Sequence, residues 1–203
     1  MFDARLRPLM DPPLNRMGQM LAGFGITANG MTLAGFAFGV AAMAAIVMGA
    51  TLAGFVLIAL NRLADGLDGA IARATRKTNL GGYLDITLDF FFYGAIPLAF
   101  AILDPDANAL PAAALLFSFY ANGSAFLAFA VMAERTGLRT DAQGAKSLYY
   151  LGGLAEGAET VAVFLLMALI PGLFPVLAWG FAIICLVSAG ARVMIGVRAL
   201  RGT

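Results

Sequence analysis

The stretches Asp65-Gly-Leu-Asp68-Gly69-Ala-Ile-Ala72-Arg73 and Gly81-Gly-Tyr-Leu-Asp85-Ile-Thr-Leu-Asp89 place four aspartates inside segments that are otherwise apolar. A carboxylate in the hydrocarbon of a bilayer is energetically costly, so ionisable residues in such segments mark functional sites. Four carboxylates so close together in the chain therefore predict a polar site within a membrane-embedded fold.

The composition of the chain also indicates a membrane protein. Hydrophobic residues make up 61% of the 203 residues and charged residues 12%, and the mean hydropathy is +0.87. Soluble domains usually contain about 25% charged residues. No linker-like segment or charge run divides the chain, so residues 1–203 are expected to form a single membrane domain.

Short polar, glycine or proline breaks separate six apolar stretches, each long enough for the ~20 residues that a spanning helix requires. We expect an all-α polytopic fold with a six-helix bundle over residues 31–199. The expected transmembrane helices cover residues 31–50, 51–74, 81–103, 108–133, 147–170 and 174–199.

The positions of lysine and arginine predict the orientation of this bundle. Apart from Arg62 and Arg192, which lie inside expected helices, these residues occur before the first stretch, at the turns after the second and fourth stretches, and near the C-terminal end, whereas the first, third and fifth turns contain none. Cytoplasmic loops carry the excess of positive charge. Both termini and the turn beside the four aspartates are therefore expected to face the cytoplasm.

The segment 1–25 is expected to form an amphipathic helix lying on the cytoplasmic leaflet. Its apolar residues recur at steps of three and four: Phe2, Leu6, Leu9, Met10, Leu14, Met17, Met20 and Leu21. The sequence Asp11-Pro12-Pro13 is expected to divide this helix, with Asp11 capping the second piece. The alternative is a partly ordered N-terminal arm.

The spacing of the aspartates predicts a metal site. Asp65 and Asp68 are three residues apart and Asp85 and Asp89 are four apart, so each pair shares one face of its helix. The short turn between the helices makes them antiparallel neighbours, and the four carboxylates can converge. The chain contains no histidine and one cysteine, Cys185, so a metal must be held by oxygen. Oxygen ligation selects Mg²⁺ or Mn²⁺.

Small residues surround the first aspartate pair and predict a bound ligand. Gly66, Gly69, Ala70 and Ala72 remove bulky side chains from this part of the helix, so another group can approach its backbone closely. Arg73 lies about one turn beyond the aspartates, where a guanidinium is suited to binding a phosphate group.

The pattern Asp65-x-x-Asp68-Gly69-x-x-Ala72-Arg73 followed by Gly81-x-x-x-Asp85-x-x-x-Asp89 resembles the defining motif of the CDP-alcohol phosphotransferases (CDP-alcohol phosphatidyltransferases), integral membrane enzymes of phospholipid synthesis. The resemblance covers nearly the whole chain and includes likeness to an enterobacterial inner-membrane member in segments 146–154 and 156–160. Seven residues separate Arg73 from Gly81, where most members have eight. Gly82 would restore that spacing.

The resemblance implies transfer of a phosphatidyl group from CDP-diacylglycerol to the hydroxyl of a small alcohol, with release of CMP, in the inner membrane of a bacterium. In such enzymes Asp65, Asp68, Asp85 and Asp89 would bind divalent Mg²⁺ or Mn²⁺, with two ions expected. Asp89 would also be the general base that takes the proton of the alcohol.

The resemblance further implies that Asp68, Gly69, Ala72 and Arg73 hold the CDP moiety. Family members commonly pair as homodimers, and no nucleic-acid partner is expected. Small-residue faces that would permit such pairing are Gly35-x-x-x-Gly39 and Gly152-Gly153.

Four residues in the second half of the chain are candidates for an acceptor pocket: Lys146, Glu156, Glu159 and Arg192. The two glutamates would suit a polyol or an amino alcohol, whereas the basic residues would suit an acceptor phosphate. Alternatively, the glutamates are structural and form hydrogen bonds across helices or salt bridges to Arg62 or Arg192. Glycerol 3-phosphate is favoured as acceptor from its prevalence among similar short members, and glycerol, inositol phosphate, serine and other amino alcohols remain open.

A divalent-cation channel or transporter is an alternative from another class, because intramembrane carboxylates also line ion pathways. It does not explain Gly69-x-x-Ala72-Arg73 beside the aspartates. A structural protein or an inactive relative is a third alternative, which the intact set of four aspartates disfavours.

Other polar or aromatic motifs receive structural interpretations. The run Phe90-Phe91-Phe92-Tyr93 is predicted to face lipid or pack between helices, and Asn122-Gly-Ser124 is predicted to pack between helices. Thr27 and Asn29 either contact the nucleotide or cap the first helix of the bundle.

Overall fold

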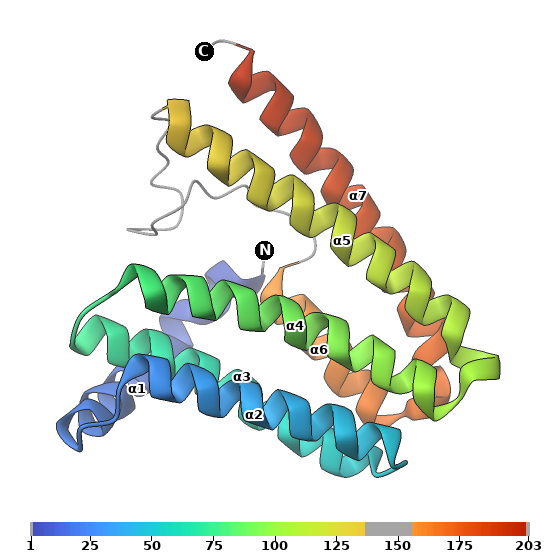
Figure 1. The fold of residues 1–203 in the computed structure, drawn as a ribbon, viewed down its shortest axis with the longest axis horizontal. Coiled ribbons are helices and arrows are strands. Elements are labelled where there is room, and N and C mark those ends of the chain that lie inside the picture. The colour runs from blue at the N-terminus through green and yellow to red at the C-terminus, as the bar shows by residue number, and fades with distance from the viewer. Residues whose placement is uncertain (1, 137–155, 202–203) are drawn as a thin grey trace.

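The computed structural model describes residues 2–136 and 156–201, with side chains from residue 11 onward. Every regular element in these ranges is helical, which confirms the all-α prediction (Figure 1). The elements are α1 (Phe2–Gly23), α2 (Ala28–Val47), α3 (Thr51–Ala74), α4 (Asn79–Leu103), α5 (Pro105–Thr136), α6 (Gly157–Leu169), the 3₁₀ turn η1 (Pro171–Leu173) and α7 (Phe174–Leu200).

Four segments of the described chain are long and apolar enough to cross a bilayer: α2, α4, α5 and the segment Pro171–Leu200. Helix α3 has 24 residues but carries the charged motif, and α6 has 13 residues. Helices α2 to α7 follow the six expected stretches in order, except that residues 147–155 of the fifth stretch lie outside the described residues. Six membrane spans therefore stay a prediction.

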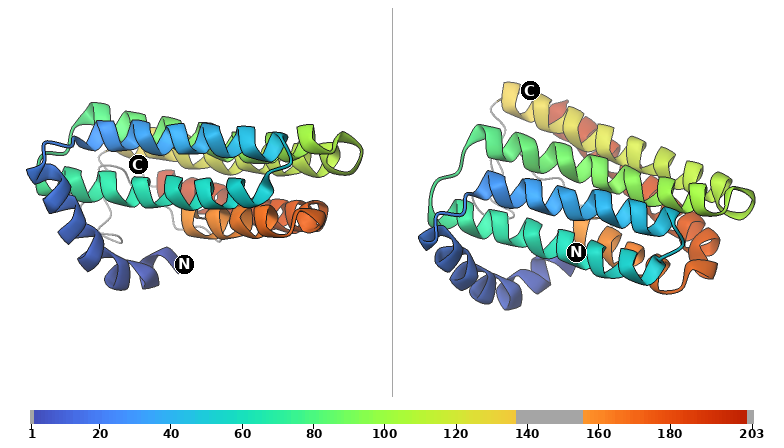
Figure 2. Two further views of the ribbon diagram at one scale, coloured as in Figure 1. Left: turned by 90° about the horizontal axis from the view of Figure 1, so that it is seen from below. Right: turned by 60° about the horizontal axis from the view of Figure 1, so that its bottom comes forward.

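Helix α1 is continuous from Phe2 to Gly23, so the expected break at Asp11-Pro12-Pro13 is wrong. A proline inside a helix lacks one donor and crowds the carbonyl four residues earlier. The helix accommodates its prolines by curving as it passes beside α3, against which it packs (Figure 2). This tertiary contact compensates for the weakened local helix.

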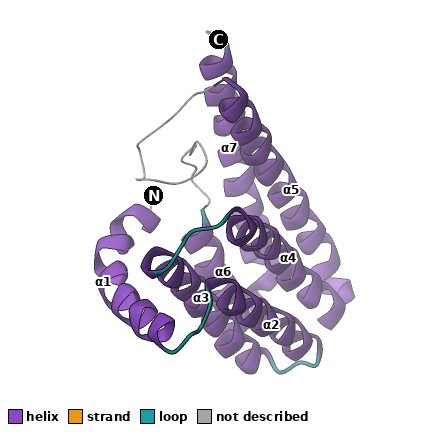
Figure 3. Cartoon of the chain, turned by 60° about the vertical axis from the view of Figure 1, so that its left-hand side comes forward, coloured by secondary structure: helices purple, strands orange, loops and turns teal. Residues whose placement is uncertain are grey.

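Helices α3 and α4 carry the aspartates, and α2 packs against both of them (Figure 3). Glycines on α2 permit this close packing. A Cβ added at Gly35 would lie 3.1 Å from the Cβ of Ala64, and one at Gly39 would lie 2.9 Å from Cδ2 of Phe92. The side-chain amide of Asn61 also donates to the carbonyl of Gly35 at 2.9 Å. These contacts fix α2 against both motif helices.

The face Gly35-x-x-x-Gly39 is therefore used within the chain, where both glycines are buried. The expectation that this pair supports a homodimer is wrong, because a close approach of a second chain would require the surface that α3 and α4 already cover. The other expected face, Gly152-Gly153, lies outside the described residues.

The remaining long helices, α5 and α7, run side by side and join the first half of the fold through an aromatic core (Figure 1). The rings of Phe119 and Phe164 are 6.0 Å apart, as are those of Phe119 and Phe181, and Phe92 lies 5.9 Å from Phe164. Such edge-to-face pairs add to the packing energy of the buried rings. The same core includes Cys185, which is 0% exposed.

Candidate active site

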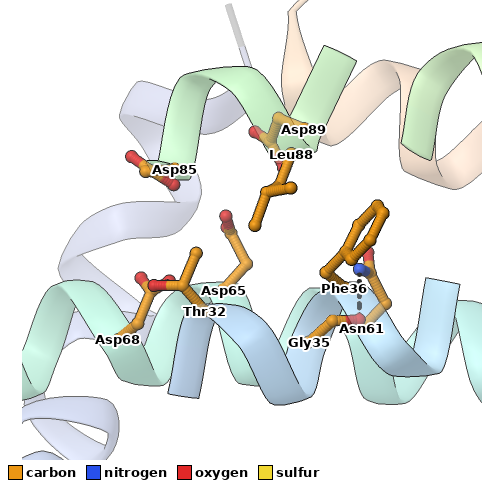
Figure 4. Close-up of a pocket in the computed structure, with 9 residues that line it drawn as sticks. All are labelled: Thr32, Gly35, Phe36, Asn61, Asp65, Asp68, Asp85, Leu88 and Asp89. Carbon is orange, nitrogen blue, oxygen red and sulfur yellow. Dashed lines mark hydrogen bonds between the residues drawn. The ribbon is translucent and has the colours of Figure 1, made fainter. Parts of the chain in front are cut away.

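The four aspartates of the motif meet between α3 and α4, near the ends of these helices (Figure 4). Asp68 lies six residues before the end of α3 at Ala74, and Asp85 lies six residues after the start of α4 at Asn79. The loop 75–78 reverses the chain between them. Both aspartates therefore lie at the same depth, about 9 Å from the helix ends at 1.5 Å per residue.

Three of the carboxylates form a cluster that fits a divalent cation. Asp65, Asp68 and Asp85 each offer one oxygen, and these three oxygens lie within 4.8 Å of one another. Asp89 lines the same pocket from the next turn of α4 (Figure 4). An anionic set of oxygen donors is the set that Mg²⁺ and Mn²⁺ prefer.

The pocket between the aspartates is small, at about 20 Å³, which is room for roughly one water-sized species. The pocket is therefore too small to contain a nucleotide. The lining residues come from α2, α3 and α4: Thr32, Gly35, Phe36, Asn61, Asp65, Asp68, Asp85, Leu88 and Asp89.

Thr32 of α2 is a site residue that the sequence analysis missed. Its hydroxyl donates to Oδ2 of Asp68 at 2.6 Å, and Asp68 is only 7% exposed. A hydrogen bond from a neighbouring group orients a metal-binding carboxylate. No local spacing in the sequence links residue 32 to residue 68, so only the packing of α2 on α3 reveals this contact.

Arg62 lies one turn before Asp65 on α3 and forms an ion pair with it. Its Nη1 is 2.5 Å from Oδ2 of Asp65, and both side chains are largely buried, with 33% and 21% exposed. The guanidinium therefore neutralises one of the four negative charges of the cluster. The spacing of three residues on one helix predicts that the two side chains are neighbours.

Tyr93 contacts the aspartate expected to act as a base. Its ring packs against Phe92 and Phe164, which confirms the predicted packing between helices. Its hydroxyl also donates to Oδ2 of Asp89 at 3.4 Å, a contact that the sequence analysis missed. The spacing of four residues on one helix was the available signal. A Cβ added at Gly157 would lie 3.3 Å from this hydroxyl and 3.7 Å from Nη2 of Arg62, so the first turn of α6 lies against this part of the site.

The residues expected to hold the CDP moiety lie along the last turns of α3. A Cβ added at Gly69 would lie 3.3 Å from Nη1 of Arg73, which shows that the guanidinium folds back over this glycine. Nε of Arg73 donates to Oδ1 of Asn15 in α1 at 3.0 Å, a contact that the sequence analysis missed. Ala72 is half-buried in the same turn.

The shorter spacing between the two parts of the motif is accommodated at the start of α4. A Cβ added at Gly81 would lie 3.0 Å from Oδ1 of Asn29 and 3.1 Å from Oγ1 of Thr78, whereas nothing lies within 4 Å at Gly82. A side chain at position 81 would therefore crowd Asn29 and Thr78, whereas one at position 82 would not. Thr78 caps α4 by accepting from the amide of Gly81, and Thr27 caps α2 by the same geometry.

The candidates for the acceptor pocket are distributed over α6 and α7. Glu156 is 8% exposed and immediately precedes α6, and Glu159 is half-buried in the first turn, the turn that lies against Tyr93. Arg192 is buried in α7 with its guanidinium 5.2 Å from the ring centroid of Phe126. Lys146 lies outside the described residues.

Comparisons with known proteins identify the same family that the aspartate motif resembles. The sequence model described as CDP-alcohol phosphatidyltransferase matches residues 25–194. The inner membrane protein YnjF of Escherichia coli is 45% identical over 201 residues, which cover 99% of this chain and 98% of that protein. Archaetidylinositol phosphate synthase of Pyrococcus horikoshii is 38% identical over 87 residues, which cover 42% of this chain and 46% of that protein.

The fold is similar to that of a solved structure, the Mycobacterium tuberculosis phosphatidylinositol phosphate synthase (PgsA1) with CDP-DAG bound. The TM-score is 0.71 with 24% sequence identity, over 90% of this chain and 92% of that one. A structure of the same synthase with manganese and citrate also has a TM-score of 0.71. The family match spans the aspartates and most of the helical chain, so this chain belongs to the CDP-alcohol phosphatidyltransferase family.

Proposed function

We propose that the protein transfers a phosphatidyl group from CDP-diacylglycerol to the hydroxyl of a small alcohol and releases CMP. The observation that carries this proposal is the carboxylate cluster of Asp65, Asp68 and Asp85, whose oxygens lie within 4.8 Å. Gly69 and Arg73 lie in the next turns of the same helix, as a phosphate-bearing ligand requires. A cation channel would need the carboxylates but not this arginine, and the family to which the chain belongs consists of transferases.

We assign up to two Mg²⁺ or Mn²⁺ ions to Asp65, Asp68, Asp85 and Asp89. The manganese in the M. tuberculosis synthase structure supports this assignment. Bound divalent ions would supply positive charge to the diphosphate and to the departing CMP. Arg62 already balances one of the four carboxylates, which leaves three negative charges in the cluster for the ions.

The donor would lie along α3 outside the small pocket, with its diphosphate near Asp68, Gly69, Ala72 and Arg73. The guanidinium of Arg73 is exposed and can bind two phosphate oxygens at once. The CDP-DAG bound in the similar M. tuberculosis synthase supports this choice of donor.

Asp89 would act as the general base. The acceptor oxygen forms a bond to the phosphorus that carries diacylglycerol, the bond from that phosphorus to the bridging oxygen breaks, and CMP leaves with that oxygen. The proton of the acceptor hydroxyl passes to the Asp89 carboxylate. Tyr93 donates to Oδ2 of Asp89 and so orients the carboxylate.

We propose inositol phosphate as the acceptor, in place of the glycerol 3-phosphate favoured from the sequence. The names of the P. horikoshii and M. tuberculosis relatives support this choice. The four residues proposed for the acceptor pocket would offer both types of group that such an acceptor requires, because glutamates accept hydrogen bonds from ring hydroxyls and cations bind phosphate. The glutamates are Glu156 and Glu159, and the cations are Lys146 and Arg192.

We also propose that residues 1–203 form one domain with six spans, lying in the bacterial inner membrane as a homodimer with both termini and the active site at the cytoplasmic side. The name of the E. coli relative, an inner membrane protein, supports the location. The four apolar segments in the described chain support a polytopic arrangement.

The test is CMP release by the purified protein in detergent, with CDP-diacylglycerol, Mg²⁺ or Mn²⁺, and a panel of acceptors. The panel contains inositol phosphate, glycerol 3-phosphate, glycerol and serine. We expect metal-dependent release that inositol phosphate stimulates most strongly. Stimulation by another acceptor alone would reassign the acceptor, and no release with any of them would contradict the proposed reaction.

A further inference from the structure

We propose that α1 is part of the donor site and that Asn15 is a positioning residue for Arg73. This inference rests on the proposed function, in which Arg73 binds the diphosphate of the donor. Its basis is the hydrogen bond from Nε of Arg73 to Oδ1 of Asn15, 3.0 Å long, between residues that are 58 positions apart in the chain.

The hydrogen bond fixes the guanidinium at its inner end. Nε of Arg73 is held by Asn15, and Nη1 lies near the backbone of Gly69, 3.3 Å from where a Cβ would stand. A planar guanidinium with one edge held in this way keeps its orientation, while bidentate contact with phosphate uses the terminal nitrogens. The group is therefore oriented before the donor arrives.

The docking of α1 on α3 places Asn15 at the required position. A Cβ added at Gly66 would lie 3.2 Å from Cδ1 of Leu14, and one added at Gly18 would lie 2.6 Å from the Cβ of Ala70. These two contacts are one turn apart on both helices, and the ribbon shows α1 lying beside α3 (Figure 2). Asn15 lies between them.

The hydrogen bond between Arg73 and Asn15 should affect the affinity for the donor more than the stability of the fold. Arg73 is exposed, and a long, mobile side chain loses rotamer freedom when it binds a ligand. A hydrogen bond that restricts it beforehand reduces this loss. Because an exposed hydrogen bond adds little to the stability of the fold, its removal should weaken donor binding and leave the melting temperature nearly unchanged.

The experiment measures binding of CDP, the soluble part of the donor, to the purified full-length protein in detergent with Mn²⁺ by calorimetry, together with steady-state turnover of CDP-diacylglycerol. Asn15→Leu preserves the size of the side chain and removes the acceptor. We expect the CDP Kd and the donor KM to rise about three- to tenfold, the range for one lost hydrogen bond of ordinary strength. We expect kcat to change less than about twofold.

The matched control is Gln19→Leu, which makes the same kind of substitution at an exposed position of the same helix. A second pair of variants tests the docking itself. Gly18→Ala introduces a Cβ into the contact with Ala70, whereas Gly23→Ala introduces one where nothing lies within 4 Å. We expect Gly18→Ala to weaken CDP binding and Gly23→Ala to leave it unchanged.

Arg73→Gln separates this inference from the proposed function. If Arg73→Gln weakens CDP binding but Asn15→Leu and Gly18→Ala leave the Kd within about twofold of the control variants, α1 is not part of the donor site and the inference is overturned. If Arg73→Gln itself leaves CDP binding unchanged, the assignment of Arg73 to the donor is wrong and the inference falls with it.

Discussion

Thr32 of α2 donates a 2.6 Å hydrogen bond to Oδ2 of Asp68 on α3. Asp68 is 7% exposed and also belongs to the cluster of three carboxylates. The hydroxyl therefore fixes the rotamer of this carboxylate from a different helix. The orientation of the metal-binding oxygens depends on the packing of α2 against α3 as well as on the motif itself.

Thr32→Val should weaken metal binding, because valine has the shape of threonine without the donor. We expect the Mn²⁺ Kd to rise about tenfold, as for other groups that orient metal ligands. The measurement is Mn²⁺ titration of the purified protein followed by electron paramagnetic resonance. Thr32→Ser retains the hydroxyl and should bind Mn²⁺ nearly as wild type does. Equal affinity in the valine and serine variants would contradict this prediction.

Arg62→Gln should strengthen the binding of divalent cations. It removes the guanidinium that is paired with Asp65, so the repulsion among the carboxylates increases and a cation relieves more of it. We expect Mn²⁺ to bind at least about threefold more tightly and the melting temperature to rise more on adding Mn²⁺ than in wild type. Arg198→Gln, at an exposed position near the end of α7, is the control. Weaker Mn²⁺ binding in Arg62→Gln would refute the charge argument.

Asp89→Asn should abolish most turnover and preserve binding. The amide cannot take a proton from the acceptor hydroxyl, and loss of a general base reduces rates by about 100-fold or more. CMP release measures the loss, and CDP calorimetry measures the retained binding. Asp104→Asn is the matched control, because Asp104 is exposed and caps α5 through an oxygen that asparagine retains. Turnover near the wild-type rate in Asp89→Asn would remove Asp89 as the base.

Tyr93→Phe should reduce kcat moderately. It removes the hydroxyl that donates to Asp89 at 3.4 Å and retains the ring that packs on Phe92 and Phe164. We expect kcat to fall about three- to tenfold with an unchanged donor KM. Tyr83→Phe changes a tyrosine that is 66% exposed and should have no effect. A fall in melting temperature without a change in kcat would assign Tyr93 a purely structural role.

Gly39→Ala should destabilise the fold. The added Cβ would lie 2.9 Å from Cδ2 of the buried Phe92, and extra volume in a packed contact costs about 1–3 kcal/mol. We expect a lower melting temperature in detergent. At Gly180, nothing lies within 4 Å of an added Cβ, so Gly180→Ala should leave the melting temperature unchanged or raise it slightly. Equal melting temperatures for the two variants would show that α2 can move away from α4.

The ends of a helix could be predicted from the sequence where the apolar stretch stops at a residue that also turns the backbone. The expected helix 51–74 has the bounds of α3, Thr51–Ala74, because Gly49 takes a positive φ of 79° in the turn before it. The use of each helix face could not be predicted. Residues that face lipid and residues that face another helix are equally apolar in a membrane protein, so nothing in the hydropathy of Gly35 and Gly39 indicates that α3 and α4 cover them.

The part of the site that could be predicted consists of charged residues, which stand out in an apolar sequence. Charged residues in apolar helices are rare, which is why the aspartates indicated the cluster. Thr32 and Asn15 could not be found, because hydroxyl and amide groups are common in helices and their partners lie in distant parts of the chain. The packing of Tyr93 was predicted, but its hydrogen bond to Asp89, one turn earlier on α4, was missed because its aromatic neighbours indicated an apolar run.

The burial of Cys185 has a practical consequence for spectroscopy. It is the single cysteine of the chain and is 0% exposed, and maleimide or spin-label reagents react with accessible thiolates. The native sequence should therefore give a nearly silent background for labelling. A cysteine introduced at the exposed Gln19 of α1 would carry one fluorophore or nitroxide, which would report whether α1 stays packed on α3 when nucleotide and bilayer are supplied.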